Sequence, residues 1–497
     1  MIQIKDNVIK KQNNFWNNCL FHPTDAIEDS WGKRILDRMA EDNSVKTIRI
    51  YTMFEDIVYI DMNGTLQYDF RANDLRLDYL IEKGFDVLLA YAAMPDCIAQ
   101  STTSKTSVSF NKTRYKGKMY NTSPPKDYAL WEEVCYEYTK HIVERYGIER
   151  VSKWRMQCFN ESDIPDFFAS FLPADAIGER VKEYCKLYKA FENGITRVSK
   201  EIKIGGPALA LHIEEFLKPW LEYVKENNLK LDFISYHNYG CLGFYDAAQL
   251  GVNALNVENH LNKHQRLVNT VTECGFENLP IVIDEWGTVG GGFKNITQVP
   301  ELIFRETEVF AAFFAKLIYK FINSAYVVDK IMICLSGQHE MQQEFTGFRG
   351  FFTMNNAAKP IYNAHVLAAK LNENILESSV EDKNIFVVPT KDENINYSVL
   401  ISYSSDDFDE DLPEIEEKLV FDFDTQNKKI TVWCIDKENT NPYRMYEKFE
   451  NKELTEEQIA MLQKESSLKP VVLENCANEL TLKLTANCTY LVTVSEE

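Results

Sequence analysis

At 497 residues, with 45% apolar and 26% charged residues, the chain has the composition of a soluble globular protein and room for two or three domains. Its net charge of −21 at pH 7 argues against nucleic acid and against an anionic membrane as partners, because both would repel it. Eleven cysteines without a CxxC pair indicate neither a disulfide framework nor a zinc module. No apolar h-region opens the sequence and no run approaches about 18 apolar residues, so we expect a reduced, cytoplasmic protein.

The first two thirds of the chain alternate between strand and helix patterns. Eight strands are predicted at 15–20, 45–51, 85–91, 151–159, 202–207, 231–237, 281–285 and 330–335. Helical periodicity falls between them at 24–42, 74–83, 128–146, 173–199, 213–226, 258–274 and 302–323. Repeated β-then-α order requires a parallel sheet, and eight units close it into a (β/α)8 TIM barrel. The Ser-, Thr- and Asn-rich segment 96–125 is long for a connection, and we interpret it as an active-site lid.

The pattern changes at about Pro360, where short alternating strands replace the helices. These strands are predicted at 385–388, 396–403, 419–423, 429–435, 479–484 and 489–494, with an acidic, solvated connection at 406–417. Such a series is typical of an antiparallel β domain, here a β-sandwich. We therefore predict a catalytic α/β barrel at 15–358 and a C-terminal β-sandwich domain at 359–497, to which residues 1–14 add a strand.

Two glutamates stand at the ends of predicted barrel strands. Glu161 follows the fourth strand in WRMQCFNES, and Glu285 ends the seventh in LPIVIDEWG. Catalytic side chains of TIM barrels lie at the carboxyl ends of the strands. Two facing carboxylates suit glycosidic cleavage, in which one protonates the leaving oxygen and the other stabilises or attacks the anomeric carbon. The neighbouring Asp284 is expected to point to the opposite face of the barrel and to be structural.

Several motifs, in this order, resemble glycoside hydrolase family 39, whose retaining enzymes include β-xylosidases and α-L-iduronidases. They are FWNNC, VKTIRIYTMF, SPPKDYALWEEV with HIVERYG, WRMQCFNES, IGGPA, DFISYHNYG, LPIVIDEWG and the tail from IDKENTNPYRMYEKF to LTEEQIAML. The resemblance covers nearly the whole chain. It implies a retaining exo-glycosidase, most similar to a β-xylosidase, that acts on short oligosaccharides or glycosides without cofactor or metal. Since the family often forms dimers or tetramers, a homo-oligomer is also an expectation.

The resemblance also implies roles for individual residues. Glu161 would be the general acid/base and Glu285 the nucleophile, while Asn160 would bind the sugar 2-OH. His237 and Tyr239 would contact the −1 sugar or the nucleophile. Three further residues are expected to bind substrate: Tyr51 and Trp286 at strand ends, and Phe348 in the GFRGFF segment.

Departures from the family pattern fall on the sugar pocket. Tyr51 stands where the family often has His, Cys334 stands where xylosidases tend to have Trp, and LFHPTDA replaces a GTGR-like loop. Gln338, His339 and Glu340 follow the eighth strand and either read a group absent from xylose or form a rearranged loop. The −1 sugar therefore stays open among xyloside, arabinoside, glucoside, galactoside and uronide.

Two other classes of function remain alternatives. A metal-dependent barrel enzyme could use Glu161, His237, Glu285 and His339 as ligands. A carbohydrate-binding protein could have kept the barrel and lost turnover, although retention of both glutamates argues against it. Activity that survives a chelator and depends on both glutamates would separate a glycosidase from either class.

Overall fold

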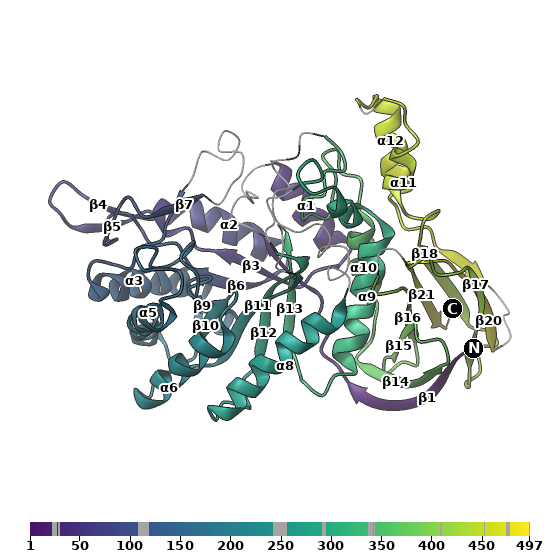
Figure 1. Ribbon diagram of the computed structural model, residues 1–497, viewed down its shortest axis with the longest axis horizontal. Helices are drawn as coiled ribbons and strands as arrows, with labels where there is room; N and C mark the ends of the chain where they lie inside the picture. Colours follow the sequence, from purple (N-terminus) through teal and green to yellow (C-terminus); the bar gives the residue numbers. More distant parts are fainter. Residues whose placement is uncertain are drawn as a thin grey trace.

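A computed structural model describes the chain except for residues 22–26, 28–29, 108–118, 242–255, 291–294, 336–340, 342, 408–409, 452, 474–477 and 497. It consists of a closed barrel and a separate sheet built mostly from the C-terminal residues (Figure 1). Both ends of the chain lie at this sheet, on the right of the view. The predicted fold class, a TIM barrel followed by an antiparallel β domain, is confirmed.

The barrel closes in the order β10-β11-β12-β13-β2-β3-β6-β9, with every neighbouring pair parallel. In chain order its strands are β2 (Asn18–Phe21), β3 (Thr47–Tyr51), β6 (Asp86–Tyr91), β9 (Arg155–Cys158), β10 (Lys203–Leu209), β11 (Phe233–Cys241), β12 (Ile281–Val289) and β13 (Lys330–Leu335). All eight predicted strands are therefore present. The fifth, sixth and seventh of the eight strands, β10, β11 and β12, run further at their carboxyl ends than predicted, so they carry residues toward the mouth of the barrel.

A described helix follows each barrel strand. These helices are α1 (Ser30–Glu41), α2 (Arg71–Glu82), α3 (Tyr128–Tyr146), α5 (Ile177–Val198), α6 (Lys218–Glu226), α8 (Val257–Glu273), α9 (Glu308–Ile322) and α10 (Pro360–Ala368). Local sequence explains their limits, as α3 illustrates. The Asp127 carboxylate accepts a hydrogen bond from the Ala129 amide at its start, and Gly147 ends it at φ 79°, a conformation that favours glycine.

The C-terminal sheet has nine strands in the order β19-β18-β21-β16-β15-β14-β1-β17-β20. They are β1 (Ile2–Lys11), β14 (Asn374–Val380), β15 (Ile385–Lys391), β16 (Tyr397–Tyr403), β17 (Ile415–Phe421), β18 (Lys429–Ile435), β19 (Val471–Leu473), β20 (Glu479–Leu484) and β21 (Cys488–Ser495). Both halves of the sheet contribute to one apolar core, so it folds over on itself as a sandwich. The N-terminal strand β1 lies between β14, antiparallel, and β17, parallel.

Several elements differ from the sequence prediction. Residues 360–368 form α10 instead of β structure, because all nine are buried against α9 and the barrel and the run lacks strand alternation. Residues 148–151 form the short helix α4 (Ile148–Val151), so the fourth strand starts at Arg155. The C-terminal unit also holds two helices that were not predicted, α11 (Pro442–Tyr446) and α12 (Glu456–Glu465).

Short hairpins fill two connections. The sheet β4 (Val58–Ile60) and β5 (Leu66–Tyr68) follows η1 (Phe54–Asp56) after the second strand. The segment predicted as a lid holds β7 (Lys105–Ser107) and β8 (Met119–Asn121), which pair antiparallel on either side of residues that lie outside the described part. Two predicted helices begin with other helical forms, η2 (Ile213–Leu217) before α6 and η3 (Pro300–Glu306) before α9.

The barrel and the sheet are joined through α9 and α10, which lie between them in Figure 1. One continuous apolar core includes barrel residues together with Val388, Leu400 and Leu491 of the sheet. Lys316 of α9 is buried and donates to the Ser405 carbonyl and the Asp406 carboxylate at 2.8 Å each. The proposed division into residues 15–358 and 359–497 stays a prediction.

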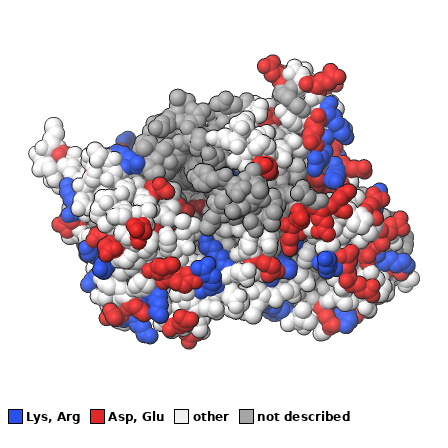
Figure 2. Space-filling view, in the orientation of Figure 1, with Lys and Arg blue, Asp and Glu red and all other residues white. Residues whose placement is uncertain are grey.

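The charged side chains of this protein are mostly acidic, with 75 Asp and Glu against 54 Lys and Arg. Figure 2 shows Asp and Glu gathered most densely on the right, over the C-terminal sheet, in agreement with the net charge of −21. Within the described residues, no helix combines the length and the apolar character needed to cross a membrane.

Candidate active site

Glu161 lies in the turn that ends the fourth barrel strand. Phe159 and Glu161 both have positive φ, 62° and 45°, which non-glycine residues adopt at a cost of about 1 kcal/mol or more each. The turn is held by Asp163, whose buried carboxylate accepts hydrogen bonds from three amides at the end of β10: Ala210, Leu211 and His212, at 2.7–2.9 Å. The polar residues after Cys158 therefore form a fixed turn that directs Glu161 into the mouth of the barrel.

Glu285 lies on β12 at a β-bulge. Along the neighbouring strand Tyr236 pairs with Ile283 and His237 with Glu285, so Asp284 is an extra residue. A bulge sends two consecutive side chains to the same side of a strand. Both Asp284 and Glu285 consequently point into the barrel. The expectation that Asp284 faces the opposite side is wrong, because strict alternation does not hold at the bulge.

Arg49 of β3 joins the carboxylates to the fourth strand. Its fully buried guanidinium donates to Glu285 Oε1 at 2.8 Å, to Asn160 Oδ1 at 2.7 Å and to Gln157 Oε1 at 2.8 Å, and it lies 3.2 Å from Asp284 Oδ2. Five rigid N–H donors make arginine suited to such a hub. Arg49 lies within the predicted strand 45–51, but the sequence gives no sign that its side chain holds both Asn160 and Glu285.

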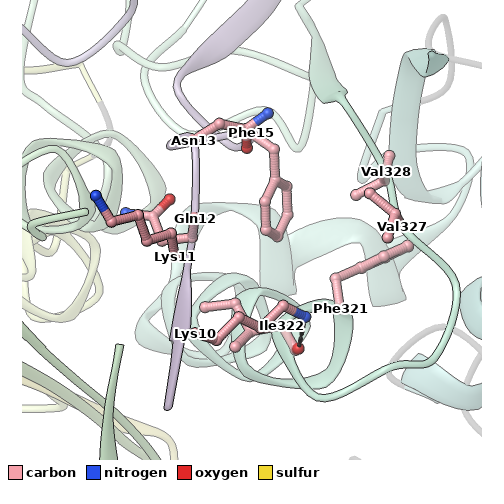
Figure 3. Close-up of a pocket in the computed structure, with 9 residues that line it drawn as sticks. All are labelled: Lys10, Lys11, Gln12, Asn13, Phe15, Phe321, Ile322, Val327 and Val328. Carbon is pink, nitrogen blue, oxygen red and sulfur yellow. Dashed lines mark hydrogen bonds between the residues drawn. The ribbon is translucent and has the colours of Figure 1, made fainter. Parts of the chain in front are cut away.

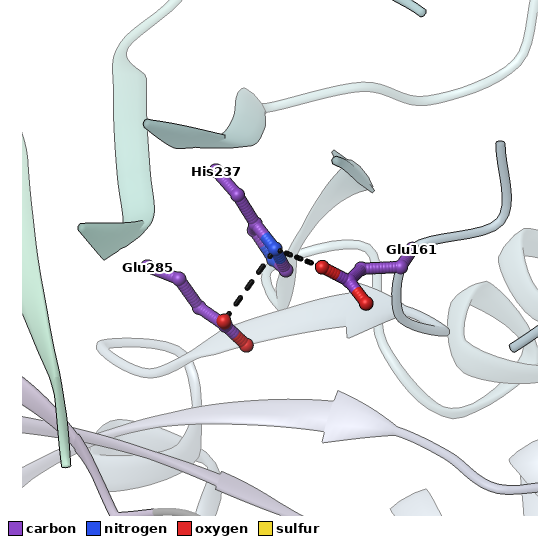
Figure 4. A group of neighbouring side chains, drawn as sticks. All are labelled: Glu161, His237 and Glu285. Carbon is purple, nitrogen blue, oxygen red and sulfur yellow. Dashed lines mark hydrogen bonds and ion pairs between the residues drawn. The ribbon is translucent and has the colours of Figure 1, made fainter. Parts of the chain in front are cut away.

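His237 lies between the two glutamates, as Figure 4 shows. Its Nδ1 is 2.8 Å from Glu161 Oε1 and 3.5 Å from Glu285 Oε2, and its Nε2 is 3.7 Å from Asp284 Oδ2. Burial alone would lower the pKa of His237, but the charges of Glu285 and Asp284 and its hydrogen bonds outweigh burial and raise the pKa to about 10. His237 is therefore an imidazolium at neutral pH.

The environments of the three carboxylates differ. Burial raises the pKa of Glu161, against the opposing hydrogen bond and charge of His237. Burial would also raise the pKa of Asp284, but the charges of Arg49 and His237 prevail and lower it. Carboxylate oxygens of Glu161 and Glu285 lie within 4.8 Å of one another. The site thus pairs a carboxyl group that favours its protonated form with a carboxylate held by a buried cation.

Tyr239 and Tyr51 complete the surroundings of Glu285. The Tyr239 hydroxyl donates to Glu285 Oε2 at 2.9 Å and accepts a 2.5 Å hydrogen bond from Arg349 Nη1. The ring of Tyr51 lies beneath the Arg49 guanidinium, 5.1 Å from ring centre to Cζ. Burial raises the pKa of both phenols well above the ordinary value, so both stay neutral donors. Of the predicted substrate-binding residues, Asn160, His237, Tyr239 and Tyr51 therefore gather around the two glutamates.

Trp286 does not belong to this group. Its indole is 1% exposed and stacks on Phe314 of α9, with ring centres 5.7 Å apart and an interplanar angle of 7°. The residue after the bulge faces the outer side of the barrel, where the helices pack. Its predicted role in substrate binding is therefore wrong. Tyr236 faces the same side and belongs to the core.

The remaining candidates have different outcomes. Phe348 is buried, and its carbonyl accepts a hydrogen bond from Lys359, while its role in substrate binding stays a prediction. Gln338, His339 and Glu340 lie outside the described residues. Arg349, next to Phe348, is the residue of this segment that contacts the site.

Glu161, His237 and Glu285 also offer three ligand atoms within 4.8 Å of one another. A metal ion requires a neutral imidazole, because the ligating nitrogen must carry a lone pair. A metal ion at Nδ1 of His237 would have to replace the 2.8 Å hydrogen bond between this atom and Glu161 Oε1.

The described pockets lie elsewhere. One, of about 350 Å³, is shown in Figure 3 and is bounded by Lys10, Phe15, Phe321 and Val328. Phe15 precedes β2 and Val328 precedes β13, so this pocket lies at the amino ends of the barrel strands. Active sites of TIM barrels lie at the opposite end.

Comparison with known proteins adds independent information. The sequence model described as "Glycosyl hydrolases family 39" matches residues 1–477. A curated β-xylosidase of Caldicellulosiruptor saccharolyticus is 28% identical over 483 residues, covering 92% of this chain and 90% of the relative. The human α-L-iduronidase is 25% identical over 121 residues, which cover 22% of this chain and 18% of that protein.

Solved structures show the same fold. A monomeric β-xylosidase from Caulobacter crescentus CB15 superposes with a TM-score of 0.83 at 18% identity, covering 100% of this chain and 99% of that one. A GH39 enzyme from Xanthomonas axonopodis pv. citri has a TM-score of 0.79 at 18% identity, with coverage of 100% and 97%. The barrel and the C-terminal sheet are thus common to all three chains.

Proposed function

The chain belongs to family 39 of the glycosyl hydrolases and is a glycoside hydrolase; on that premise we propose that it is a retaining exo-glycosidase, β-xylosidase-like, acting on short oligosaccharides or glycosides. The observation that carries the mechanism is the close approach of Glu161 and Glu285, within 4.8 Å between carboxylate oxygens. Retaining enzymes have carboxyl groups about 5–5.5 Å apart, whereas inverting enzymes need about 6.5–9.5 Å to admit a water molecule.

The surroundings of each glutamate support its role. Glu285 accepts hydrogen bonds from Arg49 and Tyr239, which favour the ionised carboxylate that a nucleophile requires. Glu161 has a raised pKa, which favours the protonated form that a general acid requires. Two carboxyl groups whose neighbours separate their protonation states can act as acid and nucleophile at the same pH.

The proposed reaction has two displacements. In the first, a Glu285 oxygen bonds to the anomeric carbon, the glycosidic C–O bond breaks, and the Glu161 proton passes to the leaving oxygen. In the second, water bonds to the anomeric carbon, its proton passes to the Glu161 carboxylate, and Glu285 is released. Two inversions at one carbon give net retention. Asn160, which Arg49 orients at 2.7 Å, would bind the sugar 2-OH.

The first test is hydrolysis of nitrophenyl β-D-xyloside, β-D-glucoside, β-D-galactoside, α-L-arabinoside and a uronide. We expect one of them to be cleaved, and Glu161→Ala or Glu285→Ala to abolish or strongly lower the rate. Glu273→Ala, on the exposed side of α8, is the matched control and should keep the wild-type rate. Azide should rescue Glu285→Ala with a glycosyl azide of the opposite anomer. Full activity of Glu285→Ala would contradict the proposal.

A metal-dependent enzyme is the second candidate, because the ligand atoms of Glu161, His237 and Glu285 converge. The proposed glycosidase should be indifferent to EDTA. Activity that is lost on chelation and restored by a divalent cation would favour the metal enzyme instead.

We also propose a cytoplasmic location and a homo-oligomeric state. The described cysteines are free, as a reducing compartment would keep them, and the acidic surface disfavours nucleic acid as a partner. Thiol titration of the denatured protein isolated without reductant should find all eleven thiols. Light scattering should give a multiple of the 57.6 kDa chain mass, and a mass of one chain would contradict the oligomer.

A further inference from the structure

We propose that Arg349 is a positioning residue, whose guanidinium fixes the direction of the Tyr239 hydroxyl and thereby the hydrogen bond that Tyr239 donates to Glu285. The inference rests on the proposed role of Glu285 as nucleophile. It adds to that role a residue of the segment after the eighth strand, Arg349, whose hydrogen bond to Tyr239 links it to Glu285.

The chemistry of the three groups determines the direction of each hydrogen bond. A guanidinium has donors and no acceptor, so the 2.5 Å contact between Arg349 Nη1 and the Tyr239 oxygen uses a lone pair of the phenol. An ionised carboxylate has acceptors and no donor, so the 2.9 Å contact with Glu285 Oε2 uses the phenol proton. With Arg349 in place, the hydroxyl cannot turn its proton toward the guanidinium, and Glu285 is its charged acceptor.

Arg349 is itself held by the backbone that precedes it. Gly347 has φ 76°, its amide donates to Glu306 and its carbonyl accepts from Arg305 at 3.0 Å. A Cβ at Gly347 would come within 2.7 Å of Ile296 Cγ2, so only glycine fits. Lys359 forms a buried 2.8 Å ion pair with Glu306 and also contacts the Phe348 carbonyl. Buried ionic groups thus fix the segment on both sides of Phe348.

The C-terminal unit supports the same segment from outside. Phe345 packs against Tyr443 and Tyr446 of α11, with ring centres 5.3 and 4.9 Å apart. Arg349 also lies over the Tyr239 ring, 5.1 Å from its centre, a second contact that restrains the phenol. The Tyr239 hydroxyl is therefore restrained by a cation that the protein holds in place at several points.

Loss of this restraint has a defined chemical consequence. Without Arg349 the phenol proton can rotate away from Glu285, and the carboxylate loses part of the donation that favours its ionised form. We expect the pKa of the nucleophile to rise and the transition state, in which Glu285 must be correctly aimed, to be less stabilised. The effect should appear in kcat more than in KM, because Arg349 acts through Tyr239 rather than on substrate.

The test is a double-mutant cycle with Arg349→Met and Tyr239→Phe, using the best aryl glycoside of the panel. We expect each single variant to lower kcat about 10–100-fold, the value of one or two charge-assisted hydrogen bonds. The double variant should lie within about 3-fold of Tyr239→Phe, because the arginine has no hydroxyl left to orient. The acid limb of the pH–rate profile should move to higher pH in Arg349→Met. Arg155→Met, at the opposite end of the barrel, is the matched control.

Independent controls keep the proposal open to refutation. Arg349→Lys retains a buried cation and donors, so it should recover part of the rate lost in Arg349→Met when Tyr239 is present, and none of it in Tyr239→Phe. Thermal unfolding verifies that each variant is folded. Multiplicative losses in the double variant, or an unchanged acid limb, would overturn the positioning role while wild-type hydrolysis still supports the proposed function. Absence of any glycoside hydrolysis by the wild type would overturn both.

Discussion

At the mouth of the barrel, neighbouring charges give carboxyl groups of the same chemical type different protonation states. Asp284 and Glu285 adjoin Arg49, whereas Glu161 contacts His237 and is the most exposed of the three, at 15% for its side chain. Because the pKa of Glu161 is raised and that of Asp284 is lowered, Glu161 rather than Asp284 is the carboxyl group that favours its protonated form, beside the imidazolium of His237. The site can therefore deliver a proton beside an ionised nucleophile.

This assignment predicts the pH dependence of activity. A general acid works in its protonated form, so the rate should fall as pH rises through the raised pKa of Glu161. In Glu161→Ala, tested with a dinitrophenyl glycoside whose leaving group needs no proton, the alkaline limb should disappear. Glu273→Ala should keep the wild-type profile, and an alkaline limb that persists in Glu161→Ala would assign it to another group.

The protonation of His237 also predicts a pH dependence of stability. Its pKa is about 10 in the folded protein against an ordinary 6.5, so its contribution to the free energy of unfolding is complete below pH 6.5 and is lost as pH rises through 10. The thermal midpoint of the wild type should therefore fall over this interval relative to His237→Asn. The half-buried His212 serves as the matched control, and His212→Asn should follow the wild type. Parallel curves for His237→Asn and wild type would contradict the imidazolium.

Sequence could identify the two glutamates because strand order places the fourth and seventh strand ends at one mouth. It could not orient their neighbours. The directions in which Asp284 and Trp286 point depend on a bulge of one residue in β12. The bulge exchanges the inner and outer faces of the strand, and the sequence IVIDEWG carries no signal for it. Arg349 comes from a segment without regular structure, so its contact with Tyr239 depends on tertiary packing alone.

At the scale of elements, a buried polar contact lies at the start of α9. Glu308, in its first turn and fully buried, accepts hydrogen bonds from Asn441 and Arg444 of the C-terminal unit at 2.7 Å each. A carboxylate at a helix N-terminus is also favoured by the helix dipole. These contacts attach the helix that packs behind Trp286 to the loop that carries α11.

Arg444→Met should therefore destabilise the protein. The substitution leaves the Glu308 carboxylate buried with Asn441 but without its cation, and removal of one partner of a buried pair is costly. Because Arg444 is 29% exposed, we expect a loss of about 2 kcal/mol rather than the larger values of fully buried pairs. Urea unfolding of this variant and of Arg34→Met, an exposed residue of α1, measures the difference. Equal stability of the two variants would contradict the account.

Element type was predictable where one periodicity was long and unbroken, as in the barrel strands and α3, α5 and α8. The prediction of element type failed at α10, because a helix buried on all sides has no polar face and therefore no amphipathic pattern. The short helix α4 was likewise read as part of the fourth strand, since four residues are too few to show a helical period.

At the scale of the whole molecule, the barrel and the sheet share structure. The apolar core runs from the barrel through α9 and α10 into the sheet, and β1 from the start of the chain pairs within the C-terminal sheet. Sequence composition placed the two architectures correctly. It could not show this continuity, because contacts between distant segments have no local pattern.

A fragment of residues 1–358 should consequently fail to fold stably. It lacks α10, which is fully buried against α9, and it exposes the face of α9 that contacts β15, β16 and β21. A fragment of residues 12–370, which keeps α10, should be more soluble but still less stable than the whole chain. Circular dichroism and thermal unfolding of both fragments check the prediction. A cooperative transition at the full-length midpoint in the shorter fragment would show that the barrel is independent.

The central claim is that Glu285 is the nucleophile of a double displacement, and covalent trapping tests it most directly. The wild type is incubated with an activated 2-deoxy-2-fluoro glycoside of the sugar it hydrolyses, digested and mapped by mass spectrometry. We predict one sugar per chain, attached to Glu285, and no adduct in Glu285→Ala. Attachment to the adjacent Asp284, or turnover to an inverted product with no adduct, would contradict the assignment of residue and mechanism.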